Sequence, residues 1–382
     1  MFLHVVQGDD TPYYYIGDGM LETYVRIGNE SVVADATEHK RLVLRGRNSS
    51  FDARPSDESI DDYAFTKLRS RYYAWNGTSF DNKLFRSFGL VDNKGILTNA
   101  GLLIADECPI RQSRVFCTRW NGKNKASGTI DALDNIEITG GLVTLLEDTM
   151  AFIRRNTKTM WYKEPMQRVE IPEYVERCVM EVVVNALAHR DYLIQGSEIH
   201  VDMFDDRMVI YSPGAMPEGR IVQDMVLSEI PSVRRNPVIA DVFAHLGFME
   251  RKGSGMGKII DPIKALPYYT DTIMPIFFSD RAQFTVTFPN IIKIINNNDT
   301  NNETDDTNNN TNNDTNNDTN NELQGNLDKW IKAKIIENPQ ISTMELAKLS
   351  GKSVSTIKRH IAKMTNIQYV GNRRNGHWEI IS

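Results

Sequence analysis

Three polar residues with a regular spacing carry the clearest chemical signal in the chain. Glu181, Asn185 and His189 lie in the segment EVVVNALAHRDY, each four residues after the last, among Val, Ala and Leu. Four residues are just over one helical turn, so the three side chains form one row along a helix. That row must face water, a polar network or a ligand, because carboxylate, amide and imidazole groups need hydrogen-bond partners. A ligand site and a solvated helix face are the two alternatives.

A second signal is the glycine-rich segment KGSGMGK, in which Gly253, Gly255 and Gly257 occupy every second position before an apolar helical run. Glycines let the backbone approach a ligand closely, and the N-terminus of the following helix favours anions. The segment is therefore a candidate phosphate cradle, with a structural turn as the alternative. A Walker loop is excluded because Lys252 and Ile259 stand where it needs Gly and Ser or Thr. The G-x-G-x-G spacing also differs from the dinucleotide-binding fingerprint.

The elements that position these residues alternate between helix and strand along the chain. The apolar periodicity predicts helices over residues 61–75, 140–157, 172–190, 235–250 and 258–266. It predicts strands near residues 22–28, 111–122 and 281–289, and two strands within 197–214 that are joined at Asp205 and Asp206. This order is typical of a multidomain α/β or α+β protein.

Three segments together resemble a known nucleotide-binding family. They are EVVVNALAHRDY, VIYSPGAMPEG and RRNPVIADVFAHLGFMERKGSGMGKI. They look like the divergent ATPase domain of prokaryotic transcriptional regulators labelled "RecG-like helicase" or "divergent AAA". The arrangement is similar to the Bergerat-type ATP-binding fold, an α/β sandwich shared by gyrase B subunits, MutL proteins and histidine kinases. The resemblance implies ATP and Mg²⁺ as cofactors.

The resemblance also implies a role for each matching residue. Glu181 would be the general base that polarises a water at the γ-phosphate. Asn185 would be the metal ligand, supplying an oxygen to Mg²⁺. The remaining nucleotide-binding residues would be Gly214, Gly253, Gly255, Gly257 and Lys258.

The sequence departs from this family pattern at the end of one strand. The superfamily expects an Asp there, followed by a glycine turn, to bind the adenine amino group. Here Ser212 and Pro213 precede Gly214, and a serine cannot hold adenine as a carboxylate does. The choice of nucleotide therefore stays open. The charged cluster at 189–191 favours a structural role at the helix end, and Arg234 to Pro237 is either a phosphate-binding lid or a helix start capped by Asn236.

Composition changes divide the chain into five expected parts. Residues 1–48 resemble the end of a Schlafen/Alba-type DNA-binding domain, so the chain is expected to be an N-terminally truncated member. A connecting region with a small winged-helix-like element at 82–104 follows over 49–165, and the ATP-binding domain over 166–292. An Asn-, Thr- and Asp-rich linker at 293–324 is expected to be a disordered tether, with an ordered Asn ladder as the alternative. A DNA-binding domain at 325–382 completes the chain.

The C-terminal part has the pattern of a winged helix-turn-helix. A capping box at Ser342 and Glu345 opens one helix, KSVSTIKRHIAKM is the next, and a hairpin turns at Asn375 and Gly376. The second helix of such a pair enters the major groove, and the wing contacts the backbone. Ile357 and Ile361 are expected in the core, and protein binding is the alternative function. The expected DNA-binding residues are Lys352, Ser353, Ser355, Thr356, Lys358, Arg359, Lys363, Arg373 and Arg374.

Charge and cysteine content support this division. The net charge is −6, yet residues 327–382 carry ten Lys or Arg against four Asp or Glu, which suits a tail that binds a polyanion such as double-stranded DNA. Three widely spaced cysteines suit a reducing cytoplasm, and no apolar run is long enough to span a membrane.

The sequence therefore predicts a cytoplasmic, bacterial-type regulator of transcription in which a nucleotide modulates DNA binding by a homodimer. A DNA-dependent ATPase, as the helicase label claims, is the first alternative. A nucleotide-free scaffold that carries a DNA-binding tail is the second.

Overall fold

The structure is a computed structural model of the 382-residue chain. It describes residues 11–27, 30–47, 49–125, 130–163, 165–217, 220–230, 233–250 and 255–296. It also describes 331–332, 334–336, 338–339, 341–350, 357, 361, 367–370 and 377–380. The chain divides into two units, Met1–Asp305 and Asp306–Ser382, and each is described by itself. Within the described residues, none of the helices is long and apolar enough to cross a membrane.

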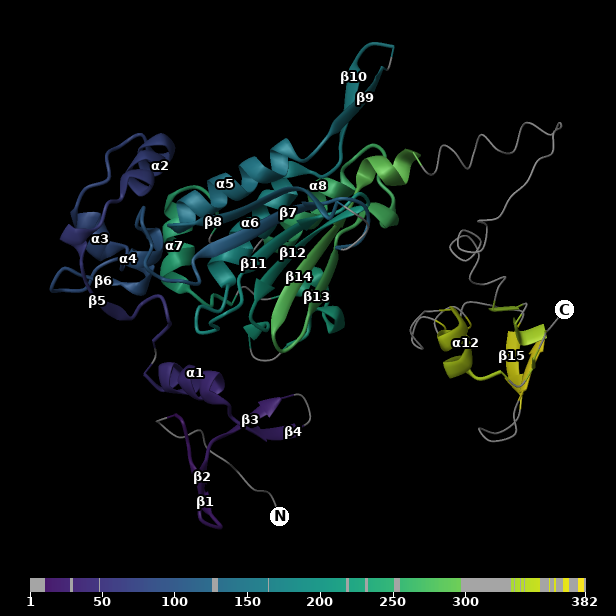
Figure 1. The fold of residues 1–382 in the computed structure, drawn as a ribbon, viewed down its shortest axis with the longest axis horizontal. Helices are drawn as coiled ribbons and strands as arrows, with labels where there is room; N and C mark the ends of the chain where they lie inside the picture. The colour runs from purple at the N-terminus through teal and green to yellow at the C-terminus, as the bar shows by residue number, and fades with distance from the viewer. Residues whose placement is uncertain are drawn as a thin grey trace. The chain divides into compact units, whose positions relative to one another are not determined.

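A six-stranded mixed sheet forms the centre of the first unit (Figure 1). The strand order is β13–β14–β12–β11–β7–β8, and the neighbours are antiparallel except for the parallel pair β7 and β11. Side chains alternate between the two faces of each strand, so one face collects the buried apolar residues. The strands are β7 (Arg114–Trp120), β8 (Ala132–Thr139), β11 (Ile199–Met203), β12 (Arg207–Pro213), β13 (Ile276–Ser279) and β14 (Gln283–Pro289).

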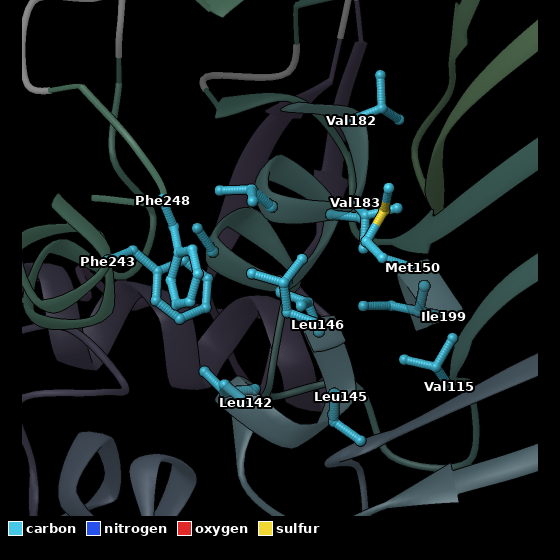
Figure 2. Close-up of a cluster of buried hydrophobic side chains, with 14 of the residues drawn as sticks. Val115, Leu142, Leu145, Leu146, Met150, Val182, Val183, Ile199, Phe243 and Phe248 are labelled. Carbon is cyan, nitrogen blue, oxygen red and sulfur yellow. The ribbon is translucent and has the colours of Figure 1, made fainter. Parts of the chain in front are cut away.

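Two helices, α5 (Leu142–Arg155) and α6 (Glu176–His189), pack on the apolar face of this sheet (Figure 1). Two more, α7 (Pro237–His245) and α8 (Gly255–Lys264), pack against α6. Figure 2 shows the core between them, where Met150 of α5 and Val183 of α6 lie beside Val115 and Ile199 of the sheet. Each such side chain contributes about 1.5–3 kcal/mol when fully buried. The core thus fixes α6, which carries the polar row, against the sheet.

The N-terminal segment consists of two small hairpins and a helix. The elements are β1 (Tyr15–Gly17), β2 (Met20–Glu22), β3 (Tyr24–Ile27), β4 (Glu30–Val33) and α1 (Ala36–Gly46). Asp35 caps α1, because its Oδ1 accepts hydrogen bonds from the backbone N–H groups of Thr37 and Glu38, both at 2.8 Å.

A helical segment precedes the sheet in sequence, and a projecting hairpin lies between strands β8 and β11. The first contains β5 (Pro55–Ser59), α2 (Thr66–Asn76), α3 (Lys83–Ser87), β6 (Ile96–Thr98) and α4 (Asn99–Ile104). It packs on α7, where the Phe88 and His245 rings stack with centroids 4.1 Å apart. The hairpin of β9 (Thr159–Lys163) and β10 (Arg168–Pro172) extends away from the sheet and helices (Figure 1). Short 3-10 helices lie at Ile60–Asp62, Val222–Asp224, Leu227–Glu229 and Asp271–Ile273.

The second unit has its own small apolar core. Its described elements are α12 (Thr343–Ser350) and the antiparallel pair β15 (Ile367–Val370) and β16 (His377–Ile380). The predicted capping box is confirmed, because the Ser342 Oγ accepts from the Glu345 N–H and the Glu345 carboxylate accepts from the Ser342 N–H. The core residues are Ile331, Ile335, Ile341, Leu346, Ala347, Ile357 and Ile361.

The structure corrects two of the predicted element boundaries. The helix predicted from residue 172 begins at Glu176, because β10 continues to Pro172. The helix after the glycine-rich segment begins earlier than predicted, at Gly255, so Gly255 and Gly257 lie in its first turn. The linker expected at 293–324 begins later than predicted, because residues 293–296 are helical. Gly253 and residues 297–324 lie outside the described residues.

Candidate functional site

The polar row of α6 lines a cavity between α6, α8 and the sheet. Glu181, Asn185 and His189 all contribute to its wall, and the cavity volume is about 180 Å³. The apolar side of α6, with Val179 and Val183, is buried in the core. Packing of that side therefore turns the polar row toward the cavity.

The glycine-rich segment approaches this row at one end of the cavity. A Cβ placed on Gly255 would lie 3.5 Å from both the Glu181 Oε1 and the Asn185 Nδ2, so the N-terminus of α8 directly abuts the acid and the amide. Lys258, one turn later, also lines the cavity. Gly257 does not, and its missing side chain would face Asp261 at 3.3 Å.

A hydrogen bond from a cysteine of α6 links the two helices next to a proline inside α8. Pro262 lies inside α8 and has no N–H to donate to the carbonyl of Lys258, one turn earlier. The Cys178 Sγ of α6 instead lies 3.8 Å from that carbonyl oxygen and donates to it. This contact is weak, but it partly satisfies a carbonyl that the helix itself leaves unpaired.

Glu181 is buried and carries a perturbed pKa. Its side chain is only 8% exposed, and its Oε1 accepts a long hydrogen bond of 3.5 Å from the Asn185 Nδ2. Burial raises the pKa of Glu181, while the charge of Lys258 and the Asn185 hydrogen bond oppose this and the charge of Glu250 adds to it. A carboxylate with a raised pKa is a better proton acceptor, so Glu181 suits a general base.

Lys258 is already paired across the mouth of the cavity. Its Nζ lies 2.9 Å from the Glu250 Oε1, and the Lys258 side chain is 17% exposed whereas that of Glu250 is 61% exposed. Because the acid is the better solvated partner, an anion in the cavity can replace it at little cost.

The other end of the cavity is built around His189, Ser212 and Gly214. Burial, together with the charges of Arg235 and Arg234, lowers the pKa of His189 to about 4, so its imidazole is neutral at pH 7. Ser212, which replaces the expected adenine-binding Asp, donates its hydroxyl hydrogen to the Ala186 carbonyl at 3.1 Å.

A buried ionic cluster holds this end in place. Asp191 is 3% exposed, and its Oδ2 accepts from Arg41 of α1 and lies 3.3 Å from the Arg235 Nη1. Gly214 lies directly against this pair at φ +116°, where a Cβ would be 2.1 Å from the Arg235 Nη1 and 2.7 Å from the Asp191 Cβ. The cluster thus connects the N-terminal segment to the cavity wall.

The neighbouring residues play the structural part expected of the 189–191 cluster. Arg190 is fully buried and donates to the backbone carbonyls of Asp191, Ile194 and Ser197. Asn236 precedes α7, with Pro237 in its first turn, but its side chain makes no cap hydrogen bond. It donates instead to the carbonyls of Ala188 and Arg190, at 3.0 and 2.8 Å, at the end of α6.

Sequence reasoning missed several residues of the cavity. Glu250 and the methionines Met216, Met225, Met249 and Met256 line it, and no spacing rule singles them out. Arg235 lies in the segment predicted as either a phosphate-binding lid or a helix start, and its partner Asp191 is far away in sequence. The expected DNA-binding residues all lie outside the described residues: Lys352, Ser353, Ser355, Thr356, Lys358, Arg359, Lys363, Arg373 and Arg374.

Comparisons with known proteins bear on the domain that contains this cavity. Residues 196–288 match the sequence model of a family described as "Putative ATP-dependent DNA helicase recG C-terminal". The match covers β11 to β14 and α8 and begins after α6. No curated protein matches the chain. The crystal structure of the DIP2311 protein from Corynebacterium diphtheriae is similar in fold, with 16% identity and a TM-score of 0.54 over 94% of this chain and 70% of that chain. The chain therefore contains a divergent ATPase-like domain related to the C-terminal region of that RecG-labelled family.

Proposed function

We propose that the first unit binds a nucleoside triphosphate with Mg²⁺ in the cavity between α6 and α8, and that this binding modulates the contact of the second unit with DNA. The observation that carries the proposal is the meeting of Glu181, Asn185, Gly255 and Lys258, which come from two separate helices, at one end of a single cavity. The match of residues 196–288 to a family labelled as an ATP-dependent helicase supports the nucleotide assignment.

The residues at this end fit a triphosphate and a magnesium ion. The backbone N–H groups of the first turn of α8 and the charge of Lys258 favour an anion. Asn185 would supply its amide oxygen to Mg²⁺, which prefers oxygen ligands. The metal would neutralise phosphate charge when bound. Glu181, within hydrogen-bond reach of Asn185, would orient and deprotonate a water.

The second unit would act as a winged helix-turn-helix on double-stranded DNA. Its capped helix α12, the hairpin of β15 and β16 and the basic surplus of residues 327–382 support this assignment. The protein would then be a transcriptional regulator that binds DNA as a homodimer, with nucleotide occupancy changing how two DNA-binding units are presented. A linked pair of modules gains affinity through effective concentration even without rigid coupling.

Titration calorimetry of the full-length chain with a non-hydrolysable ATP analogue and a non-hydrolysable GTP analogue, each with Mg²⁺, tests the nucleotide site. Binding of either analogue should depend on Mg²⁺ and weaken in Asn185→Ala. A chain that gives no heat and no thermal stabilisation with either analogue at millimolar concentration would leave the scaffold function in its place. Gel-shift titrations on random-sequence duplex DNA, with and without the analogue, test the second part. Equal DNA affinity in both conditions would show that the nucleotide does not regulate binding.

A DNA-dependent ATPase is the second candidate, and the raised pKa of Glu181 is the observation that favours it. Phosphate release that is stimulated by duplex DNA and lost in Glu181→Gln would establish this activity. Hydrolysis that persists in Glu181→Gln would exclude Glu181 as the base.

A further inference from the structure

The projecting hairpin of β9 and β10 carries large apolar side chains on its surface (Figure 1). Met160 and Trp161 are 47% and 53% exposed, and Met166, which lies between the two strands in sequence, is 98% exposed. Single exposed apolar residues are common on protein surfaces, but several on one element mark an interaction site. Methionine and tryptophan are among the residue types enriched at such sites. The hairpin is therefore a candidate interaction surface.

Strand β9 is also an edge strand without the usual protection. Among the described strands, only β10 pairs with it, in an unbroken antiparallel register from Thr159 to Lys163. Edge strands are normally blunted by proline, by a bulge or by several charges, because an open edge can pair with another chain. The sequence of β9, TMWYK, contains no proline and one charge, at its end. Since a two-stranded ribbon is only marginally stable in water, a further strand on β9 would stabilise the hairpin.

The two faces of the hairpin differ in polarity. Residues that lie directly opposite each other share a face, and Met160 lies opposite Ile171, as Tyr162 does Val169. This face is therefore apolar, whereas the other face carries the charged residues of both strands. A strand that joins β9 must present apolar side chains at the same alternate positions to extend the apolar face.

The charge of the hairpin indicates the chemistry of its partner. Residues 158–173 contain three basic and three acidic side chains, so their net charge is zero. Nucleic acids and anionic membranes bind surfaces with a basic surplus, which this segment lacks. A neutral, aromatic edge strand instead suits a strand of another protein chain.

We propose that β9 pairs with β9 of a second copy of this chain, in an antiparallel register centred on Trp161. This register places Met160 of one copy opposite Tyr162 of the other, and Thr159 opposite Lys163, so no two like charges meet. The methionine sulfur gains an aromatic contact, and the apolar faces of the two hairpins join. The result is a four-stranded sheet with a twofold axis, in which both copies contribute the same surface.

The other edge of the hairpin is less available for such pairing. Val169 and Ile171 of β10 are half-buried, and Pro172 at its end has no N–H to donate. The proposed function includes a homodimer, and β9 provides an interface for it. Because no residue of the hairpin lines the cavity, this interface requires neither nucleotide nor DNA.

Sedimentation of the full-length chain at micromolar concentration, without nucleotide or DNA, tests the interface. The native chain should sediment as a dimer. Because Trp161 lies opposite its own copy, one substitution there places two new charges face to face. Trp161→Lys and Trp161→Glu should each sediment as a monomer with unchanged circular dichroism, and an equimolar mixture of the two should restore the dimer. Leu133→Lys, at an equally exposed position on the edge strand β8, is the matched control and should stay dimeric.

Disulfide formation tests the register. Directly opposite residues of antiparallel strands have Cα atoms about 4.5–5.5 Å apart, which is within disulfide range. Trp161→Cys should therefore form an intermolecular disulfide on mild oxidation. Thr159→Cys should not, because its two copies would lie about 13 Å apart along the strands, but it should cross-link when mixed with Lys163→Cys. The native chain under the same oxidation is the control for its own three cysteines.

The outcomes separate this interface from the proposed function. A native chain that sediments as a monomer, or a mixture of the two Trp161 charge variants that stays monomeric, would overturn the pairing of β9. A dimer that persists in each charge variant alone would leave the homodimer standing but assign it to another surface. Dimerisation that is lost in these variants would support the interface even if the chain binds no nucleotide.

Discussion

Replacing Gly214 by alanine is the sharpest test of the packing at the end of the cavity near His189 and Ser212. Gly214 adopts φ +116°, and an added Cβ would lie 2.1 Å from the Arg235 Nη1 and 2.7 Å from the Asp191 Cβ. The arginine end could swing away, but the Asp191 Cβ is close to the backbone and cannot. The substitution must therefore displace Arg235 from Asp191 or shift the turn.

A second glycine provides a matched control. Gly196 also has a positive φ, +75°, but a Cβ placed on it meets nothing within 4 Å. Gly196→Ala should therefore cost only the backbone strain, about 1–2 kcal/mol. Gly214→Ala should cost at least this strain, because φ +116° lies outside the left-handed region that other residues adopt. It should also weaken a buried ion pair, for which complete loss of one partner costs about 3–5 kcal/mol. Asp191 keeps Arg41 as a partner, so we expect the lower end and a difference of about 3 kcal/mol between the variants.

Thermal unfolding of the full-length chain, followed by far-ultraviolet circular dichroism, measures this difference. At about 2–4 °C per kcal/mol, Gly214→Ala should melt about 6 °C or more below Gly196→Ala. Equal melting temperatures for the two variants would show that the close contact at Gly214 does not constrain the fold. The inferred packing of Gly214 against Arg235 and Asp191 would then be wrong.

Three further predictions concern the acids and the thiols. Burial raises the pKa of Glu181, so the ionised carboxylate disfavours the folded state at pH 7. The stabilisation from protonated Glu181 is fully present below the pKa that this group has in the unfolded chain. It is lost as the pH rises through the higher pKa of the folded state. Glu181→Gln should therefore melt higher than the native chain at pH 7 but not at pH 4, while hydrolysis, if present, falls roughly 10²–10⁴-fold; a lower melting temperature at pH 7 would contradict this. Glu250→Gln should tighten binding of the triphosphate analogue by roughly two- to fivefold in calorimetry, because it releases Lys258 from its ion pair. Weaker binding would indicate that Glu250 itself contributes to binding of the analogue. Burial raises the pKa of Cys117 and of Cys178 to about 12, so both thiols should resist a disulfide reagent at pH 8 and react at once in guanidinium chloride; rapid reaction of the native chain would place them at the surface.

The parts of the site that the sequence predicts are those with a local signature. A four-residue spacing on an apolar helix is sufficient to place Glu181, Asn185 and His189 in one row, and α6 has them in one row. The apolar run after the glycines likewise predicts α8. Several strands were missed for the opposite reason. Strand β9 is exposed along its whole length, and its sequence lacks the alternation that marks a strand packed on a core. Strand β10 does alternate, with Val169 and Ile171 half-buried, so its pattern could have been recognised.

The end of the cavity near His189 could not be predicted from the sequence, because each of its residues has an ordinary interpretation when it is considered alone. Asp191 looks like a helix-end acid, Arg235 like one of two adjacent arginines, and Gly214 like a turn glycine. The fold places the three in direct contact, and Arg41 donates to the same Asp191 oxygen that faces Arg235. The buried Arg235 Nη1 faces the Asp191 Oδ2, and the Arg235 Nη2 donates to the Ala215 carbonyl, so the guanidinium is held within the wall of the cavity. Ser212, at the position of the expected Asp, likewise donates to a backbone carbonyl, that of Ala186. These contacts join residues that are far apart in sequence, and for that reason no local pattern predicts them.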